Sequence, residues 1–222
     1  MNSRFAILLD GGFVTKRLSV LLGRFPEPED ILGVCKRISA HHRLEGRELL
    51  RIYFYDAAPA TDTVRNPING TELALGKTKI HARSESFFDR LEMEPDVALR
   101  MGETFCHGWE LGKNALKSIS KSPRQIEAND LVPKITQKGV DLRIGLDIAR
   151  ISLRQSAGII VVVTGDSDMI PAFKFARREG VRVYLETLNG GVRRDLKAHA
   201  DLVLDTWQPA NVASDDAPRQ QS

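Results

Sequence analysis

Two aspartates, Asp166 and Asp168, follow directly on an apolar run in the segment IIVVVTGDSDM. Asp10 ends a second apolar run, AILLD, and is followed by Gly11 and Gly12, which permit a tight turn and a close approach of the backbone. Carboxylates that lie close together raise one another's pKa values unless a cation neutralises them. Oxygen-only ligands are the ones that Mg²⁺ and Mn²⁺ prefer. The three aspartates therefore predict a divalent-metal site.

A fourth candidate, Asp141, lies in QKGVDLRIGLDIAR at the start of a predicted helix, where an anionic group is favourable. Asp147 lies about 240° further round a helix of ~100° per residue, so it does not share the face of Asp141. Arg143 and Arg150 flank Asp147 at helical spacing. A surface ion pair is at least as good an interpretation of Asp147, which is a secondary acidic candidate.

Three further residues are candidates for supporting roles. The hydroxyls of Thr164 and Ser167 adjoin the acidic pair and could orient its carboxylates. Lys138, shortly before Asp141, could bind the scissile or an adjacent phosphate. Basic residues within 113–138 and 174–197 could follow a phosphate backbone, although a run of charges is usually a solvated face.

A purely structural interpretation also exists for Asp166 and Asp168, which could cap and begin the helix that follows them. For the pair alone, this interpretation is as good as a metal site. When Asp10 and Asp141 are added, the functional interpretation is favoured. Asp56 and Asp205 also follow apolar runs, and we interpret each as a turn or helix-cap residue.

Strands and helices alternate along the chain to position these residues. Apolar residues at helical spacing predict helices at 28–44, 79–94, 141–155 and 171–180. Apolar runs without alternation predict strands covered on both faces, at 4–10, 49–57, 158–166 and 180–187, with a fainter strand at 95–103. This order indicates an α/β fold with a mainly parallel sheet, whose ligands bind at the carboxyl ends of the strands.

The remaining segments are less regular. Residues 58–78 have the composition of a loop, and 107–139 mix strand-like pieces with a lysine-rich connection. We expect one domain at 1–208 and a disordered polar tail at 209–222.

The composition is that of an ordinary globular protein, with 42% apolar and 27% charged residues among 222. No apolar run approaches the ~20 residues that span a bilayer, and no signal-peptide core is present, so we expect a cytoplasmic protein. The two cysteines are isolated, which argues against a disulfide framework or a zinc site. The net charge of +3 permits a polyanionic partner without requiring one.

Three ordered blocks, AILLDGGF, QKGVDLRIGLDIA and VVVTGDSDMIPAFKFARREGVRVYL, together closely resemble the NYN domain family of the PIN-like nuclease superfamily. The resemblance covers about residues 4–207. It implies a PIN-like three-layer α/β/α sandwich and metal-dependent cleavage of RNA at an acidic pocket. The family's acidic positions fall on Asp10, Asp141, Asp166 and Asp168.

The same resemblance implies Mg²⁺ or Mn²⁺ as the cofactor, single-stranded RNA as the partner, and a possible homodimer. Two positions depart from the family pattern. Many members have asparagine where this chain has Phe13, which removes a polar pocket residue, and many have phenylalanine at the position of Met169, a conservative core change.

Our primary hypothesis is a metal-dependent ribonuclease, with endo- and exonucleolytic cleavage both open. A haloacid-dehalogenase-like phosphatase would need an acid at Gly12, and a response-regulator receiver would need one at Leu9, so both are disfavoured. Two alternatives stay open: a non-catalytic RNA- or protein-binding module of the same fold, and a hydrolase of small phosphorylated metabolites.

Overall fold

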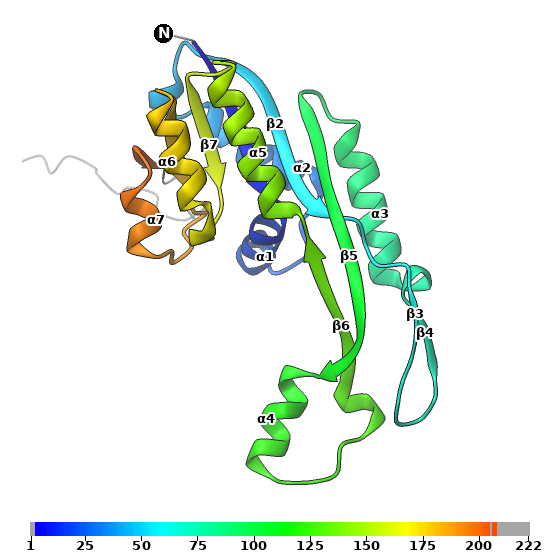
Figure 1. Cartoon of the computed structure of the whole chain (residues 1–222). Helices are drawn as coiled ribbons and strands as arrows, with labels where there is room; N and C mark the ends of the chain where they lie inside the picture. Colours follow the sequence, from blue (N-terminus) through cyan, green and yellow to red (C-terminus); the bar gives the residue numbers. More distant parts are fainter. Residues whose placement is uncertain (1–2, 205, 208–222) are drawn as a thin grey trace, which may run out of the picture.

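A computed structural model describes residues 3–204, 206 and 207, which form an α/β sandwich around a seven-stranded sheet (Figure 1). The strand order is β6-β5-β2-β1-β7-β8-β9. Neighbouring strands are parallel except for β5 and β6, so the predicted mainly parallel sheet is confirmed. The strands are β1 (Arg4–Asp10), β2 (Glu48–Ala57), β5 (Val97–Leu111), β6 (Leu131–Lys138), β7 (Ile159–Val163), β8 (Arg182–Glu186) and β9 (Leu202–Leu204).

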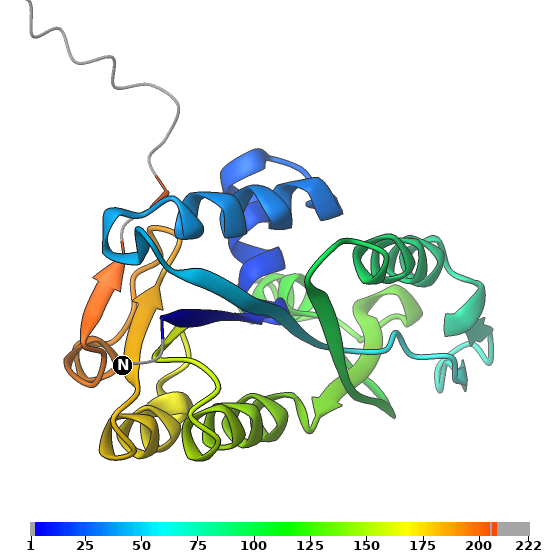
Figure 2. The ribbon, with the colours of Figure 1, turned by 90° about the horizontal axis from the view of Figure 1, so that it is seen from above.

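Helices cover both faces of the sheet (Figure 2). Successive side chains of β1 alternate between these faces: Ile7 and Leu9 belong to one core, and Ala6 and Leu8 to the other. All four are fully buried, which explains the unbroken apolar run in the sequence. The first face carries α1 (Gly11–Leu22), α2 (Pro28–Ser39) and α3 (Lys79–Glu92); the second carries α5 (Val140–Leu153), α6 (Ile170–Arg178) and α7 (Arg194–Ala198).

Helix α1 starts immediately after Asp10, where the sequence predicted only a turn. The Asp10 side chain caps the helix by accepting a hydrogen bond of 3.1 Å from Phe13 N. Gly11 permits close packing, because a Cβ at this position would lie 2.5 Å from the Tyr55 carbonyl oxygen. Asp10 is therefore both the last residue of β1 and the N-cap of α1.

An antiparallel ribbon projects from the sandwich (Figure 1). This projecting ribbon consists of β6 and the part of β5 beyond Gly102, and the short helix α4 (Lys113–Lys121) joins the two strands. Residues 58–78, predicted as a loop, contain an antiparallel hairpin of β3 (Thr63–Arg65) and β4 (Glu72–Ala74). Both features lie outside the two helix layers, so their strands lack the continuous apolar pattern of the central ones.

Two expectations concern other parts of the chain. The helix predicted at 28–44 is shorter, because α2 ends at Ser39. The tail at 209–222 lies outside the described residues. Within residues 3–204, 206 and 207, none of the helices has the length and apolar character needed to cross a bilayer.

Candidate active site

The carboxyl ends of three adjacent strands, β2, β1 and β7, bring acidic side chains to one edge of the sheet. β1 pairs in parallel with β7, and Leu9 lies opposite Val163. Asp10 and the turn after Val163 therefore leave the sheet side by side. β1 and β7 are therefore neighbours in the sheet, as a shared acidic site requires.

Asp10 is held by hydrogen bonds to both carboxylate oxygens. Oδ1 accepts from Phe13 N at 3.1 Å, and Oδ2 accepts from the Thr164 hydroxyl at 2.8 Å. Burial raises the pKa of Asp10 above its ordinary value, the two hydrogen bonds oppose this effect, and the charges of Asp141 and Asp166 raise it further. The side chain is thus fixed in position where a negative charge is disfavoured.

Asp166 and Asp168 lie at the start of the 3-10 turn η4 (Ser167–Met169). Asp166 N donates to the Thr164 hydroxyl at 3.1 Å, and Asp166 Oδ1 accepts from Asp168 N at 2.9 Å. Asp166 therefore caps η4, which is close to the role that the purely structural interpretation gives it. This role leaves its second carboxylate oxygen available for a site function.

Asp141 lies in the first turn of α5. Burial raises the pKa of Asp141, and the charges of Asp166 and Asp168 raise it further. The four predicted aspartates thus share one electrostatic neighbourhood. We call the group Asp10, Asp141, Asp166 and Asp168 the acidic edge.

The chemistry of the acidic edge fits a hydrated divalent cation, since it offers mutually repelling carboxylate oxygens. Among residues 3–204, 206 and 207, no three His, Cys, Asp or Glu side chains are arranged to hold a metal ion. Mg²⁺ keeps several waters and is commonly bound by one or two carboxylates together with substrate phosphates. The edge therefore fits an ion that retains water better than one enclosed by protein ligands.

The supporting candidates occupy different positions. Thr164 is fully buried and bonds both Asp10 and Asp166. Ser167 is half-buried in η4. Lys138 is exposed, and its Nζ lies 5.1 Å from the ring centroid of Phe105 on the projecting ribbon.

Asp147 belongs to a polar network that is separate from the acidic edge. It forms ion pairs with Arg100 at 3.1 Å and Arg150 at 3.0 Å, and it accepts a 3.0 Å hydrogen bond from the Tyr55 hydroxyl. The ion-pair interpretation is therefore supported by the geometry. Arg143, the other expected partner, instead donates to a backbone carbonyl of β5.

Asp56 is a site residue that the sequence reasoning missed. It is only 8% exposed and lies at the end of β2, next to β1, rather than capping a helix. Its Oδ1 accepts from Ala57 N at 2.7 Å and from Gln137 Nε2 at 3.0 Å. Burial raises the pKa of Asp56, and the charge of Asp10 adds to the rise. The sequence feature that could have revealed Asp56 is its position at the end of an apolar run, which it shares with Asp10.

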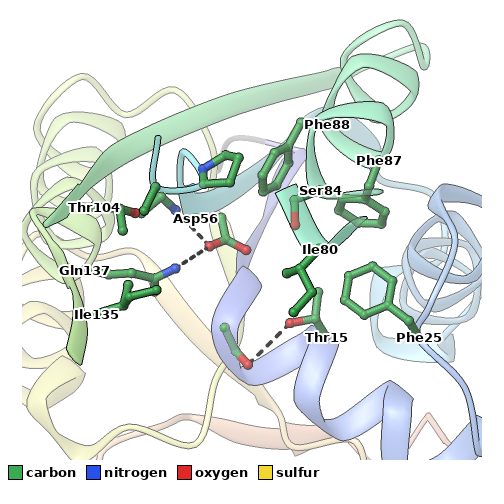
Figure 3. Close-up of a pocket in the computed structure, with 14 residues that line it drawn as sticks. Thr15, Phe25, Asp56, Ile80, Ser84, Phe87, Phe88, Thr104, Ile135 and Gln137 are labelled. Atoms are coloured by element: carbon green, nitrogen blue, oxygen red, sulfur yellow. Dashed lines mark hydrogen bonds between the residues drawn. The ribbon is translucent and has the colours of Figure 1, made fainter. Parts of the chain in front are cut away.

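A pocket of about 270 Å³ opens beside Asp56 (Figure 3). Phe25, Phe87 and Phe88 form aromatic walls of this Asp56 pocket. The other lining residues come from several elements and include Gly12 and Thr15 of α1, Ile80 and Ser84 of α3, Thr104 of β5, and Ile135 and Gln137 of β6.

Comparison with known proteins bears on the second half of the chain. Residues 107–206, which include Asp141, Asp166 and Asp168, match the family model of the NYN domain. No curated protein sequence matches the chain. The crystal structure of a protein of unknown function from Vibrio parahaemolyticus is similar, with a TM-score of 0.49 and 14% identity over 92% of this chain and 94% of that one. Residues 107–206 are therefore similar to the NYN domain, a domain of the PIN-like nucleases, in agreement with the resemblance of the sequence blocks in this part of the chain.

Proposed function

We propose that the protein is a metal-dependent ribonuclease that cleaves RNA phosphodiester bonds at the acidic edge. One observation carries the proposal: none of the ion pairs among the described residues involves Asp10, Asp141, Asp166 or Asp168. Clustered carboxylates without a protein cation are expected to recruit one from solution. The NYN domain supports nuclease chemistry as the use of such a site.

The roles of the four aspartates follow from their contacts. We assign Asp10, Asp166 and Asp168 to hold one or two Mg²⁺ or Mn²⁺ ions, directly or through water, and Asp141 to complete the cluster or orient the attacking water. When bound, the ion supplies an activated water and offsets charge on the phosphoryl oxygens. Thr164 holds Asp10 and Asp166 in a fixed relation.

RNA is the proposed substrate because exposed basic residues lie on elements that follow the carboxyl ends of the strands, on the same side of the sheet as the acidic edge. Helix α4 on the projecting ribbon contains Lys113, Lys117 and Lys121 and has no buried residue. Helix α7, which begins at Arg194, contacts η4. Lys138 and Ser167 are proposed as further phosphate contacts. Such positions suit the neutralisation of successive phosphates.

Arg177 lies away from the acidic edge, although the sequence placed it among the basic residues that could contact RNA. It pairs with Asp201 at 2.9 Å, near the start of β8, so it lies at the opposite edge of the sheet from the aspartates. We therefore assign it no contact with RNA at the acidic edge.

Cleavage of labelled single-stranded RNA tests the proposal. We expect cleavage in Mn²⁺ or Mg²⁺, none in EDTA, and a loss of activity in Asp166→Asn. Asp89→Asn changes an exposed aspartate of α3 and is the matched control, for which we expect wild-type activity. Absence of cleavage, or cleavage indifferent to both EDTA and Asp166→Asn, would reject the proposal.

A second candidate is a non-catalytic RNA-binding module. Two observations favour it: the described residues contain no ready three-ligand metal group, and Phe13 occupies a position that is polar in many relatives. This candidate predicts that the chain shifts RNA in a gel but shows no Mn²⁺ binding by calorimetry. Turnover of a generic phosphomonoester without RNA cleavage would instead indicate a metabolite hydrolase.

A further inference from the structure

We propose that the Asp56 pocket binds one unstacked nucleobase of the RNA and prefers bases with an exocyclic amino group over uracil. The identity of the ligand as RNA rests on the proposed function. The preference among bases rests on the shape and polar groups of the pocket itself.

The pocket adjoins the acidic edge. Gly12 and Thr15, which line it, lie in the first turns of the helix that Asp10 caps. A Cβ on Gly11 would lie 2.7 Å from Asp56 Oδ2, so this helix packs directly against the Asp56 carboxylate. A nucleotide with its phosphate at Asp10 is therefore placed to direct its base toward Asp56.

The size and walls of the pocket suit a single planar base. Its volume of about 270 Å³ is below the ~300–1,000 Å³ typical of pockets for drug-sized ligands. Phe87 packs between Phe25 and Phe88, with ring centroids 5.8 Å and 5.5 Å away. Ile80, 68% exposed, adds an apolar lip at the mouth. Unstacked bases are commonly held against aromatic and apolar side chains of this kind.

The polar groups of the pocket call for a ligand that donates hydrogen bonds. Asp56 Oδ1 already accepts two bonds, whereas Oδ2 has no partner among residues 3–204, 206 and 207 and points away from those donors (Figure 3). The amide nitrogen of Gln137 is used by Asp56, which leaves the Gln137 carbonyl oxygen as a second acceptor. Asp56 Oδ2 can therefore accept a hydrogen bond from a donor that a ligand brings into the pocket.

Exocyclic amino groups supply this donor. Cytosine carries an amino group where uracil carries a carbonyl oxygen, and an aspartate accepts from the cytosine amino group. A carbonyl facing Asp56 Oδ2 would instead place two acceptors together. The pocket should therefore distinguish these two bases of nearly equal size.

Binding of short oligocytidine and oligouridine of equal length tests the inference. The protein carries Asp166→Asn to prevent cleavage, and affinity is measured by fluorescence anisotropy in Mn²⁺. We expect oligocytidine to bind about tenfold more tightly, as one hydrogen bond to a charged acceptor allows. Adding Asp56→Asn, whose amide can donate to the uracil carbonyl, should abolish or invert this preference. Adding Asp89→Asn should leave it unchanged.

A second variant keeps the test decisive if Asp56→Asn does not fold. Ile80 is exposed, so Ile80→Ala should fold and should weaken both oligonucleotides by a similar factor, about threefold. Equal affinity for the two oligonucleotides, or a preference unaffected by Asp56→Asn, or unchanged binding by Ile80→Ala, would overturn the inference. A retained preference without cleavage by the wild-type protein would reject the ribonuclease proposal but support the base pocket.

Discussion

The hydroxyl of Thr164 donates a 2.8 Å hydrogen bond to Asp10 Oδ2 and joins two strands across 154 positions of sequence. The same oxygen accepts a bond of 3.1 Å from Asp166 N. One fully buried hydroxyl therefore sets the first aspartate and the start of the acidic pair relative to each other.

Thr164→Val should weaken both the fold and the site, because it keeps the shape of the side chain but removes the shared hydroxyl. We expect the free energy of unfolding to fall by about 1–3 kcal/mol, the usual cost of leaving buried polar groups unpaired. RNA cleavage should fall about tenfold as the two carboxylates lose their fixed relation. Urea denaturation and cleavage rates measure both effects. Thr164→Ser retains the hydroxyl, and equal losses in the two variants would contradict its role.

Asp10→Asn should stabilise the metal-free protein at neutral pH. Because burial raises the pKa of Asp10 above its ordinary 3.8, the folded state keeps a proton that the unfolded state loses between these two values. The free energy of unfolding of the wild type therefore falls as pH rises through this window. Above the raised pKa, the destabilisation from the buried Asp10 charge is fully present. Asparagine carries no charge, so the Asp10→Asn variant lacks this destabilisation.

Urea denaturation in EDTA at increasing pH measures this difference. The stability advantage of Asp10→Asn should grow with pH until the raised pKa is passed and should then stay constant. An advantage that does not change with pH would show that Asp10 is not destabilised by its charge.

Phe13 and Gly165 should behave as a complementary pair. A Cβ on Gly165 would lie 2.5 Å from Phe13 Cε2, so Gly165→Ala should destabilise the fold by about 1–3 kcal/mol through overpacking. Combining it with Phe13→Ala removes the ring and should make the two changes less than additive. A double-mutant cycle of unfolding free energies tests this, and additivity would contradict the contact.

Phe13→Leu should retain RNA cleavage near the wild-type rate. The contact of this residue with Asp10 comes from its backbone N–H, at 3.1 Å, and leucine keeps that group. The cleavage rate of the variant decides whether the ring itself matters. A large loss would mean that the phenylalanine side chain has a direct role in the site.

Gly11→Ala should be far more damaging than Gly12→Ala. The added Cβ at Gly11 would lie 2.5 Å from a backbone oxygen of Tyr55, whereas at Gly12 its nearest neighbour would be Asp10 Oδ1 at 3.7 Å. We expect a loss of about 1–3 kcal/mol for the first change. Alanine at Gly12 should be neutral or slightly stabilising, since it favours the helix. Thermal denaturation compares them, and equal melting temperatures would refute the close packing of α1.

The central strands and their terminal aspartates could be predicted because both depend on local signals. Strands buried on both faces read as unbroken apolar runs, and carboxyl ends of parallel strands share an edge. Asp10 and Asp166 were therefore expected to approach each other, and the pairing of Leu9 with Val163 brings this about.

Asp56 could not be assigned in the same way. An aspartate after a strand is ambiguous, and its place beside Asp10 depends on β2 pairing with β1, which is a long-range choice. Helix α1 was missed because Gly11 and Gly12 are typical of a turn, while close packing explains the first of them. The projecting ribbon lies beyond the helix layers, so its sequence lacks the pattern that revealed the other strands.

The most direct test of the acidic edge is the rate of RNA cleavage by Asp10→Asn in Mn²⁺, measured beside Asp89→Asn. We predict a loss of about 100-fold or more for Asp10→Asn with an unchanged melting curve or a higher melting temperature, and no loss for the control. A folded Asp10→Asn protein that cleaves RNA at the wild-type rate would contradict the account.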